Sequence, residues 1–382
     1  MDGYTTDYIN LIADNLRDRY DNGFPILKEL IQNADDAKAR SFVFAHHPGF
    51  PDAVHPLLRG SGLWFFNDGE FKNSDTRALR SFGINSKAGD VSAIGKFGLG
   101  MKSVFHLCEA IFYLAQDGQS LHRQGLNPWK QDGQNPHPDW DQDPAEDWDR
   151  LESLATPLVR EAAKSWFLLW VPLRRRDQVR SPLGHEVAII SRFPGDDPHP
   201  DLDFLDEPGL PFDLAEILPL LKHLERIEHR GGRNAFALGL EADQRLLGER
   251  VAGRSSGQVI LGDSGQSLRF AGMGAEDQDP DGTFARLKAR GEWPRSRYRN
   301  ERGQEQQAAD KTRPEAAALF CSGPSPDTPS DLHWAVFLPV EQGGERLKLD
   351  AGNPGHSLIL HGQFFIDAGR KKPHGLEDLH KP

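Results

Sequence analysis

Apolar residues recur at helical spacing near the start of the chain. Ile9, Ile12 and Leu16 fall on one face of a helix that this spacing predicts over residues 4–20. The same periodicity predicts a second helix over residues 25–40, which begins at a proline.

Short runs rich in aromatic and β-branched residues predict strands after these helices. The runs cover residues 41–45, 63–66, 111–115, 165–173, 186–191, 235–240, 333–340, 357–361 and 363–367. Apolar spacing also predicts a short helix over 75–82, one over 101–109 and a longer amphipathic helix over 214–229.

Two polar segments show no period of two or of 3.6 residues. Residues 116–149 are rich in Pro, Asp, Gln and Trp, and we expect an inserted surface loop or lid there. With the residues up to the next strand, this insertion covers about 116–164. Residues 274–317 are charged and contain Gly, Pro and Gln, which predicts a linker or mobile loop.

Composition narrows the class of protein. The chain has 382 residues, of which 37% are hydrophobic, with 8 Trp and 22 Phe, so it can bury a core. A net charge of −12 argues against DNA and anionic membranes as partners, and no apolar run approaches the roughly 20 residues that span a bilayer. Two cysteines, Cys108 and Cys321, suggest a reducing compartment. We expect a soluble, cytoplasmic protein.

The predicted second helix carries an unusual polar stripe. At about 100° per residue, Glu29, Asn33, Asp36 and Arg40 fall within a narrow arc. A solvated helix face is one interpretation. The other is a site, because a carboxylate and an amide oxygen one turn apart suit a hard cation and a water molecule.

A glycine-rich loop precedes the predicted helix 101–109. Its sequence is Gly95-Lys96-Phe97-Gly98-Leu99-Gly100, and such loops let backbone N–H groups approach phosphate oxygens. A plain turn is the alternative. A Walker loop would need Lys102 directly after Gly100, but Met101 stands between them and rotates the lysine about 100° around the helix.

The third feature follows the strand 63–66 directly. Asn67-Asp68-Gly69 is typical of a turn that ends a strand. A side-chain oxygen at the end of a buried strand could also accept a hydrogen bond from the adenine amino group. Each of the three features has a structural explanation when taken alone.

In this order along the chain, the three features resemble the GHKL ATPase superfamily. The segments ELIQNADDA, GINSK and GKFGLGMKSVFHL resemble in particular the sacsin-type, heat-shock-protein-90-like ATP-binding domain. The resemblance is dense over residues 8–115 and returns weakly near 165–174 and at the chain end. It implies an α+β fold, a mixed or antiparallel sheet with helices on one face, over 1–242. It also implies a smaller α/β middle or transducer-like domain over 243–382.

The resemblance implies a role for each matching residue. Glu29 would be the general base for the attacking water, Asn33 would hold Mg²⁺, and Asp36 would line the cavity. Asn67, or Asp68, would accept the adenine amino group, helped by Ser165. The phosphates would be wrapped by the loop residues Gly95, Phe97, Gly98, Leu99, Gly100 and Met101.

Two further basic residues enter through the resemblance. Lys87, in a lid over residues 72–94, would reach a phosphate, and Arg370 would reach the γ-phosphate from the second domain, with Lys371 and Lys372 as competing candidates. This sequence departs from the family in having Asn67 where the adenine-reading residue is usually Asp, and Phe71 where the second glycine of that box stands.

The function that the resemblance implies is Mg-dependent ATP binding and hydrolysis that drives a chaperone-like cycle. The alternative is a non-hydrolysing ATP-sensing scaffold in a larger assembly. A protein client and a nucleotide-dependent homodimer fit either function, whereas membranes and direct nucleic-acid binding are not expected.

Weaker polar signals have structural explanations. We expect the histidines His46, His47 and His55 in surface loops, and the run 174–176 of three arginines at a solvated strand end.

Overall fold

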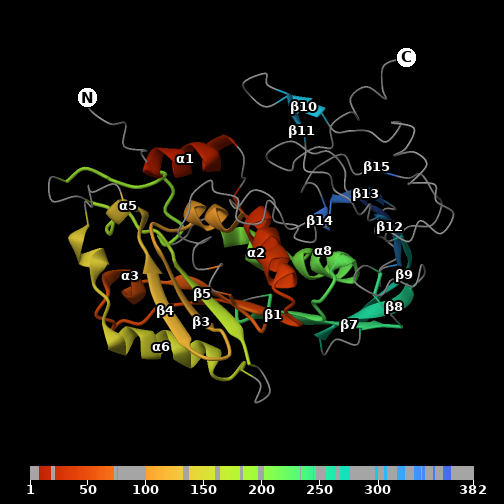
Figure 1. Cartoon of the computed structure of the whole chain (residues 1–382), viewed down its shortest axis with the longest axis horizontal. Coiled ribbons are helices and arrows are strands. Elements are labelled where there is room, and N and C mark those ends of the chain that lie inside the picture. The colour runs from red at the N-terminus through yellow and green to blue at the C-terminus, as the bar shows by residue number, and fades with distance from the viewer. Residues whose placement is uncertain are drawn as a thin grey trace.

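The computed structural model describes residues 8–18, 22–72, 75, 100–131, 137–159, 164–180, 184–196, 202–232, 234–243, 245–246, 255–262, 266–275, 297–299, 305–307, 316–322, 331–336, 338–339, 347–348 and 356–362. The fold is α+β: a large mixed sheet runs through the molecule, and helices pack against it (Figure 1).

The described helices are mostly short. The α-helices are α1 (Tyr8–Asp18), α2 (Phe24–Asp36), α3 (Pro56–Arg59), α5 (Pro128–Gln131), α6 (Ala145–Ala155), α7 (Asp203–Asp206) and α8 (Leu210–Ile217), and the 3-10 helices are η1 (Gly100–His106), η2 (Pro138–Asp141) and η4 (Leu218–Leu220).

The strands of the first 242 residues are β1 (Ser41–His47), β2 (Gly62–Asn67), β3 (Ile111–Gln116), β4 (Leu121–Leu126), β5 (Trp166–Pro172), β6 (Arg226–Arg230) and β7 (Phe236–Ala242). Those that follow are β8 (Ser255–Leu261), β9 (Gln266–Ala275), β10 (Arg297–Arg299), β11 (Glu305–Gln307), β12 (Ala316–Ser322), β13 (Asp331–Val336), β14 (Leu338–Pro339), β15 (Leu347–Lys348) and β16 (His356–Gly362).

One sheet contains all the described strands except β10 and β11, which pair with each other. Its order is β14-β13-β16-β12-β9-β8-β7-β6-β1-β2-β5-β3-β4, with β15 paired to β13. The β1–β6 and β13–β16 pairs are parallel, and the other neighbours are antiparallel. Strand pairing continues from β7 to β8 across the predicted boundary between residues 242 and 243. The division into two domains stays a prediction.

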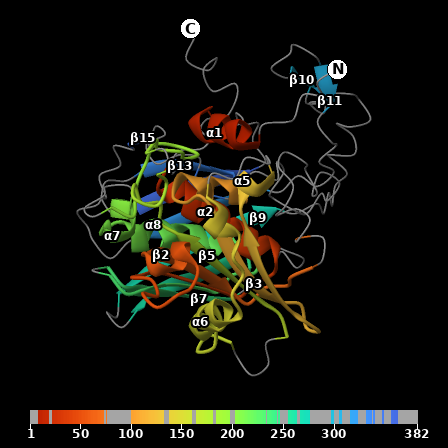
Figure 2. The same ribbon diagram turned by 90° about the vertical axis from the view of Figure 1, so that its left-hand side faces the viewer.

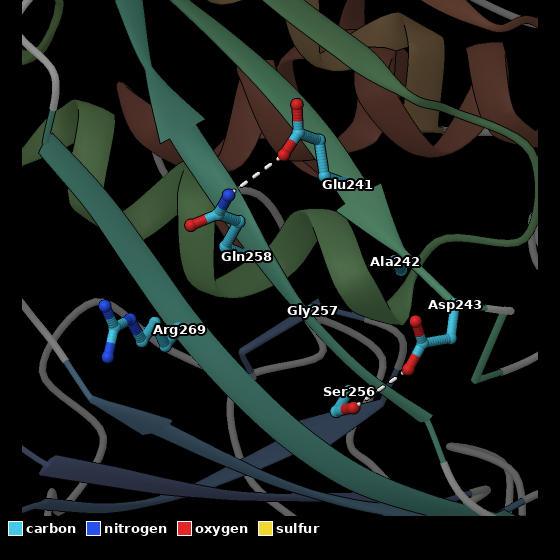
Figure 3. A pocket seen from close by; sticks show the side chains of 7 residues that line it. All are labelled: Glu241, Ala242, Asp243, Ser256, Gly257, Gln258 and Arg269. Carbon is cyan, nitrogen blue, oxygen red and sulfur yellow. Dashed lines mark hydrogen bonds between the residues drawn. The ribbon is translucent and has the colours of Figure 1, made fainter.

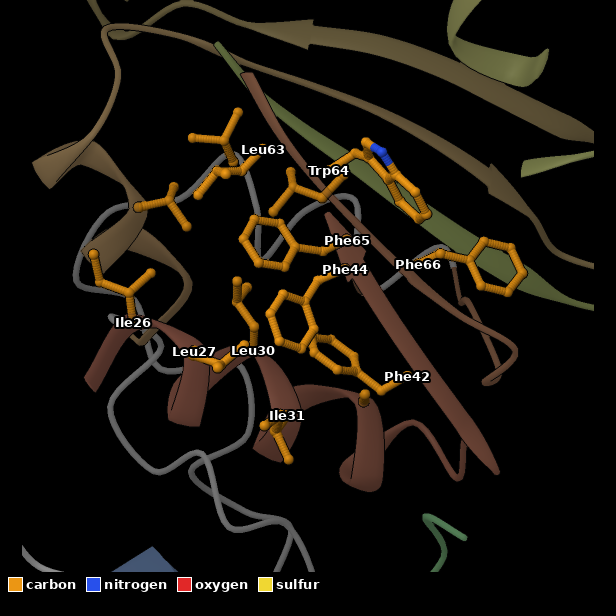
Figure 4. Close-up of a cluster of buried hydrophobic side chains, with 14 of the residues drawn as sticks. Ile26, Leu27, Leu30, Ile31, Phe42, Phe44, Leu63, Trp64, Phe65 and Phe66 are labelled. Atoms are coloured by element: carbon orange, nitrogen blue, oxygen red, sulfur yellow. The ribbon is translucent and has the colours of Figure 1, made fainter. Parts of the chain in front are cut away.

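The core between α2 and the first strands explains why both form. Ile26, Leu27, Leu30 and Ile31 come from the apolar stripe of α2 and are buried. They pack against side chains that β1 and β2 direct toward α2, among them Phe44 and Phe65. Trp64 and Phe66 point to the opposite face of the sheet (Figure 4). This packing fixes α2 against the strand ends that complete the candidate site.

Helices cover both faces of the sheet, and not one face as the sequence predicted. Trp64 pairs across β2–β5 with Trp170, which pairs across β5–β3 with Phe112. The Phe112 ring makes an edge contact with Trp148 of α6. This helix therefore lies on the face opposite α2, as Figures 1 and 2 also show.

The segment predicted as an irregular insertion is ordered in its described part, so the loop prediction is wrong there. It contains β4, α5, η2 and α6, and Trp129, Trp140 and Trp148 are buried. The segment also bonds to the loop before α3, where the Asp147 carboxylate accepts the backbone N–H groups of Val54 and His55. Burial of three large aromatic side chains stabilises this segment in spite of its polar composition.

His55 also differs from its prediction as a surface residue. Its side chain is buried and bonds Trp140 O through Nε2, while Nδ1 accepts the N–H of Leu57 at the start of α3. Burial lowers the pKa of His55. This histidine therefore serves to join α3 to the segment before α6.

The predicted helix over residues 214–229 is the largest error. The structure ends α8 at Ile217, continues with one 3-10 turn and begins β6 at Arg226. Pro219 has no backbone N–H and cannot continue an α-helix at that position. The chain therefore bends at residues 222–224 and enters the sheet beside β1.

Strands β7, β8 and β9 pack against α8 (Figure 1). Ser357 of β16 donates a hydrogen bond to Glu216 of α8, so the later strands also meet this helix. No described helix combines the length and the apolar character needed to cross a bilayer.

Candidate functional site

The polar stripe of α2 is largely buried. Glu29 is 7% exposed, Asn33 and Asp36 are half-buried, and only Arg40, beyond the helix end, is exposed. The Nδ2 atom of Asn33 is buried and has no hydrogen-bond partner among the described residues. A solvated helix face would leave these groups in water, so this burial favours the interpretation as a site.

The end of α2 is shaped by one residue in a left-handed conformation. Lys38 has φ of 60°, and its N–H bonds to Asp35 O, while the N–H of Ala39 bonds to Ala34 O. This pair of bonds is the Schellman arrangement, which usually has glycine at the left-handed position. It turns the chain sharply from α2 into β1.

The turn after β2 lies directly against this helix end. Glu70 N–H donates to Ala37 O over 2.7 Å, and Gly69 N–H donates to Asn67 Oδ1 over 3.1 Å. A Cβ on Gly69 would lie 2.8 Å from Ala37 O and 3.0 Å from Asn67 Oδ1. Only glycine fits between the two elements, and this close approach brings the Asn67 turn against the end of α2.

Of the two candidates for contact with adenine, Asp68 has a structural task. Its Oδ1 atom accepts the N–H groups of Arg40 and Ser41, both over 2.8 Å, at the start of β1. Asn67 is buried at 9% exposure and uses Oδ1 within its own turn. The geometry therefore favours Asn67 over Asp68 for a ligand contact.

Ser165, just before β5, fastens the same turn from the other side. Its hydroxyl accepts the N–H of Phe71 over 3.0 Å and donates to Gln116 O over 2.7 Å. The Phe71 ring stacks on Phe167 with centroids 5.7 Å apart. Ser165 thus orients residues 67–71 through these two bonds.

Several predicted site residues lie outside the described residues. These are Lys87, Gly95, Phe97, Gly98, Leu99 and Arg370. Gly100 and Met101 are described and begin η1, which packs against α2. The structure therefore places the end of the predicted phosphate loop beside the helix that carries Glu29 and Asn33.

Lys102, in the first turn of η1, is buried rather than solvated. Its exposure is 7%, and burial lowers the pKa of its ammonium group to about 8. Ser103 beside it is 1% exposed. The first turn of η1 therefore contains a buried ammonium group.

A buried ion pair holds the far end of η1. Arg174 donates from Nε to Glu109 and from its two Nη atoms to the carbonyl oxygens of Phe105, His106, Cys108 and Arg192. All five of its N–H groups are thus used, and the side chain is 0% exposed. The prediction that residues 174–176 form a solvated strand end is wrong for Arg174.

The Glu109 carboxylate completes this hub. It accepts Trp129 Nε1–H over 2.8 Å and the backbone N–H of Ile189. Burial raises the pKa of Glu109, and the positive charge of Arg174 opposes that shift. Because Ile189 gives its N–H to this carboxylate, residues 186–191 do not form the predicted strand; their one ladder contact is the Arg180–Glu186 bridge.

Sequence reasoning also missed Asp35. This side chain is 1% exposed, and its carboxylate accepts the backbone N–H groups of Lys222, His223 and Leu224 over 2.7–3.0 Å. Helical spacing offered a clue to this burial. Asp35 lies outside the polar arc of Glu29 and Asn33, on a part of α2 that packs against other residues. The N–H groups that it accepts could not be foreseen, because residues 222–224 were predicted as part of a helix.

A separate polar hollow of 420 Å³ lies on strands β7, β8 and β9 (Figure 3). Its lining residues largely bond one another: Gln258 donates to Glu241, and Ser256 donates to Asp243. The register places these side chains on the face opposite the buried Leu238, Val259 and Leu268. The hollow is therefore part of the outer surface of the sheet and is distinct from the α2 site.

Residues 5–122 match the family model of the Sacsin domain. The chain is 31% identical to human sacsin over 121 residues, which are 30% of this chain and 3% of that protein. It is 27% identical to the protein NO VEIN of Arabidopsis thaliana over 193 residues, 48% of this chain and 6% of that protein. The chain thus spans only a small part of the length of both relatives.

The Sacsin-domain match includes α2, the turn after β2, the glycine loop and η1. The resemblance to sacsin-type sequences is thereby confirmed for the segment that carries most of the candidate site. Ser165 and Arg370 lie beyond the matched residues.

Proposed function

We propose that this chain binds ATP with Mg²⁺ where α2, the turn after β2 and η1 meet, and that it hydrolyses the bound ATP. One observation carries the proposal: Asn33 keeps a buried amide atom without a described partner, one helical turn from the buried carboxylate of Glu29. Leaving such an atom unsatisfied costs about 1–3 kcal/mol, which a bound ligand would offset.

The residues present suit magnesium bound together with a nucleotide. The described residues contain no cluster of three His, Cys, Asp or Glu that could hold a metal alone. Mg²⁺ in nucleotide sites needs only one or two protein oxygens, because phosphates and water complete its octahedron. The Asn33 amide can present its oxygen or its nitrogen to the site, since the two are exchanged by rotation about one bond.

Each residue has one task in this proposal. Glu29 accepts the proton of the attacking water, and its burial keeps it apart from bulk solvent. Asn33 holds Mg²⁺, which neutralises phosphate charge when bound, and Asp36 lines the cavity. Asn67 accepts the adenine amino group, and the loop 95–100 wraps the phosphates with its backbone N–H groups.

The wider features of the GHKL type belong to the same proposal. They include a nucleotide domain over 1–242, a middle or transducer-like domain over 243–382, a lid over 72–94 with Lys87, and Arg370 at the γ-phosphate. A chaperone-like cycle, a protein partner, a nucleotide-dependent homodimer and a cytoplasmic location complete it.

A non-hydrolysing nucleotide switch is the second candidate. The observation that favours it is the uninterrupted strand pairing from β1 through β6, β7 and β8 to β9, which ties the site to the later strands. Bound nucleotide could act through this sheet without turnover.

Two measurements on the full chain separate these functions. Calorimetric titration with ATP in Mg²⁺ and in EDTA tests binding, and steady-state phosphate release tests turnover. Glu29→Ala should reduce turnover roughly 10²–10⁴-fold and leave ATP affinity within a few-fold. Glu146→Ala, which removes an exposed acid from α6, is the matched control.

Binding without phosphate release in the unsubstituted chain would support the switch. Phosphate release that Glu29→Ala leaves unchanged would exclude Glu29 as the base, and no binding of ATP in Mg²⁺ would exclude both functions.

A further inference from the structure

The bend at residues 222–224 is held from two sides. On one side, the Asp35 carboxylate of α2 accepts the three N–H groups of the bend. On the other side, Arg245 donates from Nη1 to Leu224 O over 2.8 Å and from Nη2 to His223 O over 2.9 Å. The same short bend therefore connects the end of α2 to a residue three positions beyond β7.

Arg245 also pairs with Glu225 over 3.4 Å, next to the bend. Glu225 N–H in turn donates to Arg40 O, just past the end of α2. The bonds of Asp35 to the bend and of Glu225 to Arg40 restrict movement of the bend relative to α2. A displacement of the helix end must be taken up by the bend and by Arg245.

The residue after Arg245 reaches the far strands. Leu246 is 2% exposed and lies over Gly272 of β9, where a Cβ would come within 2.7 Å of its methyl carbon. Gly272 stands opposite Leu319 in the β9–β12 pair. Arg245 and Leu246 thus form a two-residue bridge between the α2 bend and β9.

We propose that Asp35, the bend and the pair Arg245–Leu246 form a mechanical link through which nucleotide at α2 changes the packing of β9 and β12. Asp35 is the positioning residue of this link, because it sets the end of α2 two residues beyond Asn33. The trigger of this link, nucleotide binding at α2, rests on the proposed function. The path of the link, from Asp35 through the bend to Leu246, rests on the described contacts alone.

The path can be tested without nucleotide, by hydrogen exchange of the full chain. Arg245→Ala should speed amide exchange about threefold or more both in residues 222–224 and at the end of α2. Leu246→Ala should do so in residues 266–275. Arg269→Ala, which removes an exposed arginine on β9 from the face that lines the polar hollow, is the matched control and should change neither region.

The trigger is tested by repeating the exchange with Mg²⁺ and a non-hydrolysable ATP analogue. In the unsubstituted chain, protection should rise at residues 22–40 and at 266–275. In Arg245→Ala and Leu246→Ala it should rise at 22–40 only, with analogue affinity within a few-fold of the unsubstituted chain. Arg245→Lys and Leu246→Val keep charge or branching and should retain part of the effect if the alanine variants fail to fold.

The outcomes distinguish the two proposals. Protection at 266–275 that survives both substitutions would overturn the link even if nucleotide binds. Absence of protection at 22–40 in the unsubstituted chain would instead contradict the nucleotide site, while the exchange measured without nucleotide would still support or overturn the path.

Discussion

The carbonyl oxygen of Ala37 accepts the backbone N–H of Glu70 over 2.7 Å. This bond joins the end of α2 to the turn after β2, two elements that meet because their apolar faces share one core (Figure 4). The turn brings Asn67 to the helix that carries Glu29 and Asn33. The arrangement of the candidate site thus depends on a hydrogen bond between backbone atoms, which the side-chain pattern of the sequence does not predict.

Gly69→Ala should disturb this contact. Its Cβ would stand 2.8 Å from Ala37 O and 2.9 Å from Ala37 Cβ, and neither atom belongs to a flexible side chain. We expect a loss of about 1–3 kcal/mol in the free energy of unfolding, typical of overpacking, together with weaker nucleotide binding. Urea denaturation measures the first and calorimetry the second. Gly209→Ala is the control, since a Cβ there meets no atom within 4 Å.

Asn33→Ala should weaken ATP binding mainly when Mg²⁺ is present. Removal of the amide takes away the proposed metal ligand and leaves the helix itself intact, because alanine is a strong helix former. Titration in Mg²⁺ and in EDTA should give affinities that differ less in the variant than in the unsubstituted chain. An undiminished response to Mg²⁺ would remove Asn33 from the proposed metal site.

The sequence predicted the elements of the candidate site well, because local patterns specify them. The stripe of α2, the aromatic alternation of β1 and β2, and the turn at Asn67 are confirmed at their positions. The strands expected at 235–240 and 357–361 are also confirmed, as β7 and β16.

The errors arose where distant contacts decided the structure. Leu214, Ile217, Leu221 and Leu224 keep helical spacing, yet all are buried on both sides of a break at Pro219. The N–H groups that this break frees are the ones that Asp35 accepts. No local pattern in residues 222–224 indicates a partner 187 residues or more away.

Lys38→Gly should stabilise the protein. Lysine at φ of 60° carries the steric cost of the left-handed region, which glycine avoids. We expect a gain of about 0.5–1 kcal/mol in the free energy of unfolding, because Lys38 is exposed and forms the Schellman end of α2. Lys38→Ala keeps the Cβ and should give no such gain. Equal stability of the glycine and alanine variants would show that φ at this position carries no cost.

Arg174→Met should strongly destabilise the fold. It leaves the buried Glu109 carboxylate without its cation and strips four carbonyl oxygens of their donors, which typically costs about 3–5 kcal/mol for a buried ion pair. Denaturant unfolding at pH 7 measures the loss. Arg176→Ala, two residues away, breaks an exposed pair with Glu186 and should cost about 1 kcal/mol or less.

The double variant Glu109→Gln with Arg174→Met separates charge from hydrogen bonding. Neutralising the glutamate removes the uncompensated charge, so the double variant should be more stable than Arg174→Met alone. If the double variant is no more stable than Arg174→Met, the lost hydrogen bonds, and not the buried charge, dominate the effect of losing Arg174.

Lys102→Met should stabilise the protein at neutral pH and spare nucleotide binding. Burial lowers the pKa of Lys102 to about 8 from 10.5, so the folded state binds its proton less tightly than the unfolded state does. The cost of charging the buried group is fully present below pH 8 and disappears as pH rises through 8 toward 10.5. Methionine removes this cost and should raise the free energy of unfolding by about 1–3 kcal/mol at pH 7, with a difference that narrows as pH rises above 8. Urea unfolding between pH 6.5 and 9.5 measures the trend, and Lys130→Met on α5 removes an exposed lysine as the control. A folded Lys102→Met variant that has lost all ATP binding would place this ammonium on the phosphates, in favour of a Walker-type loop over the site proposed at α2.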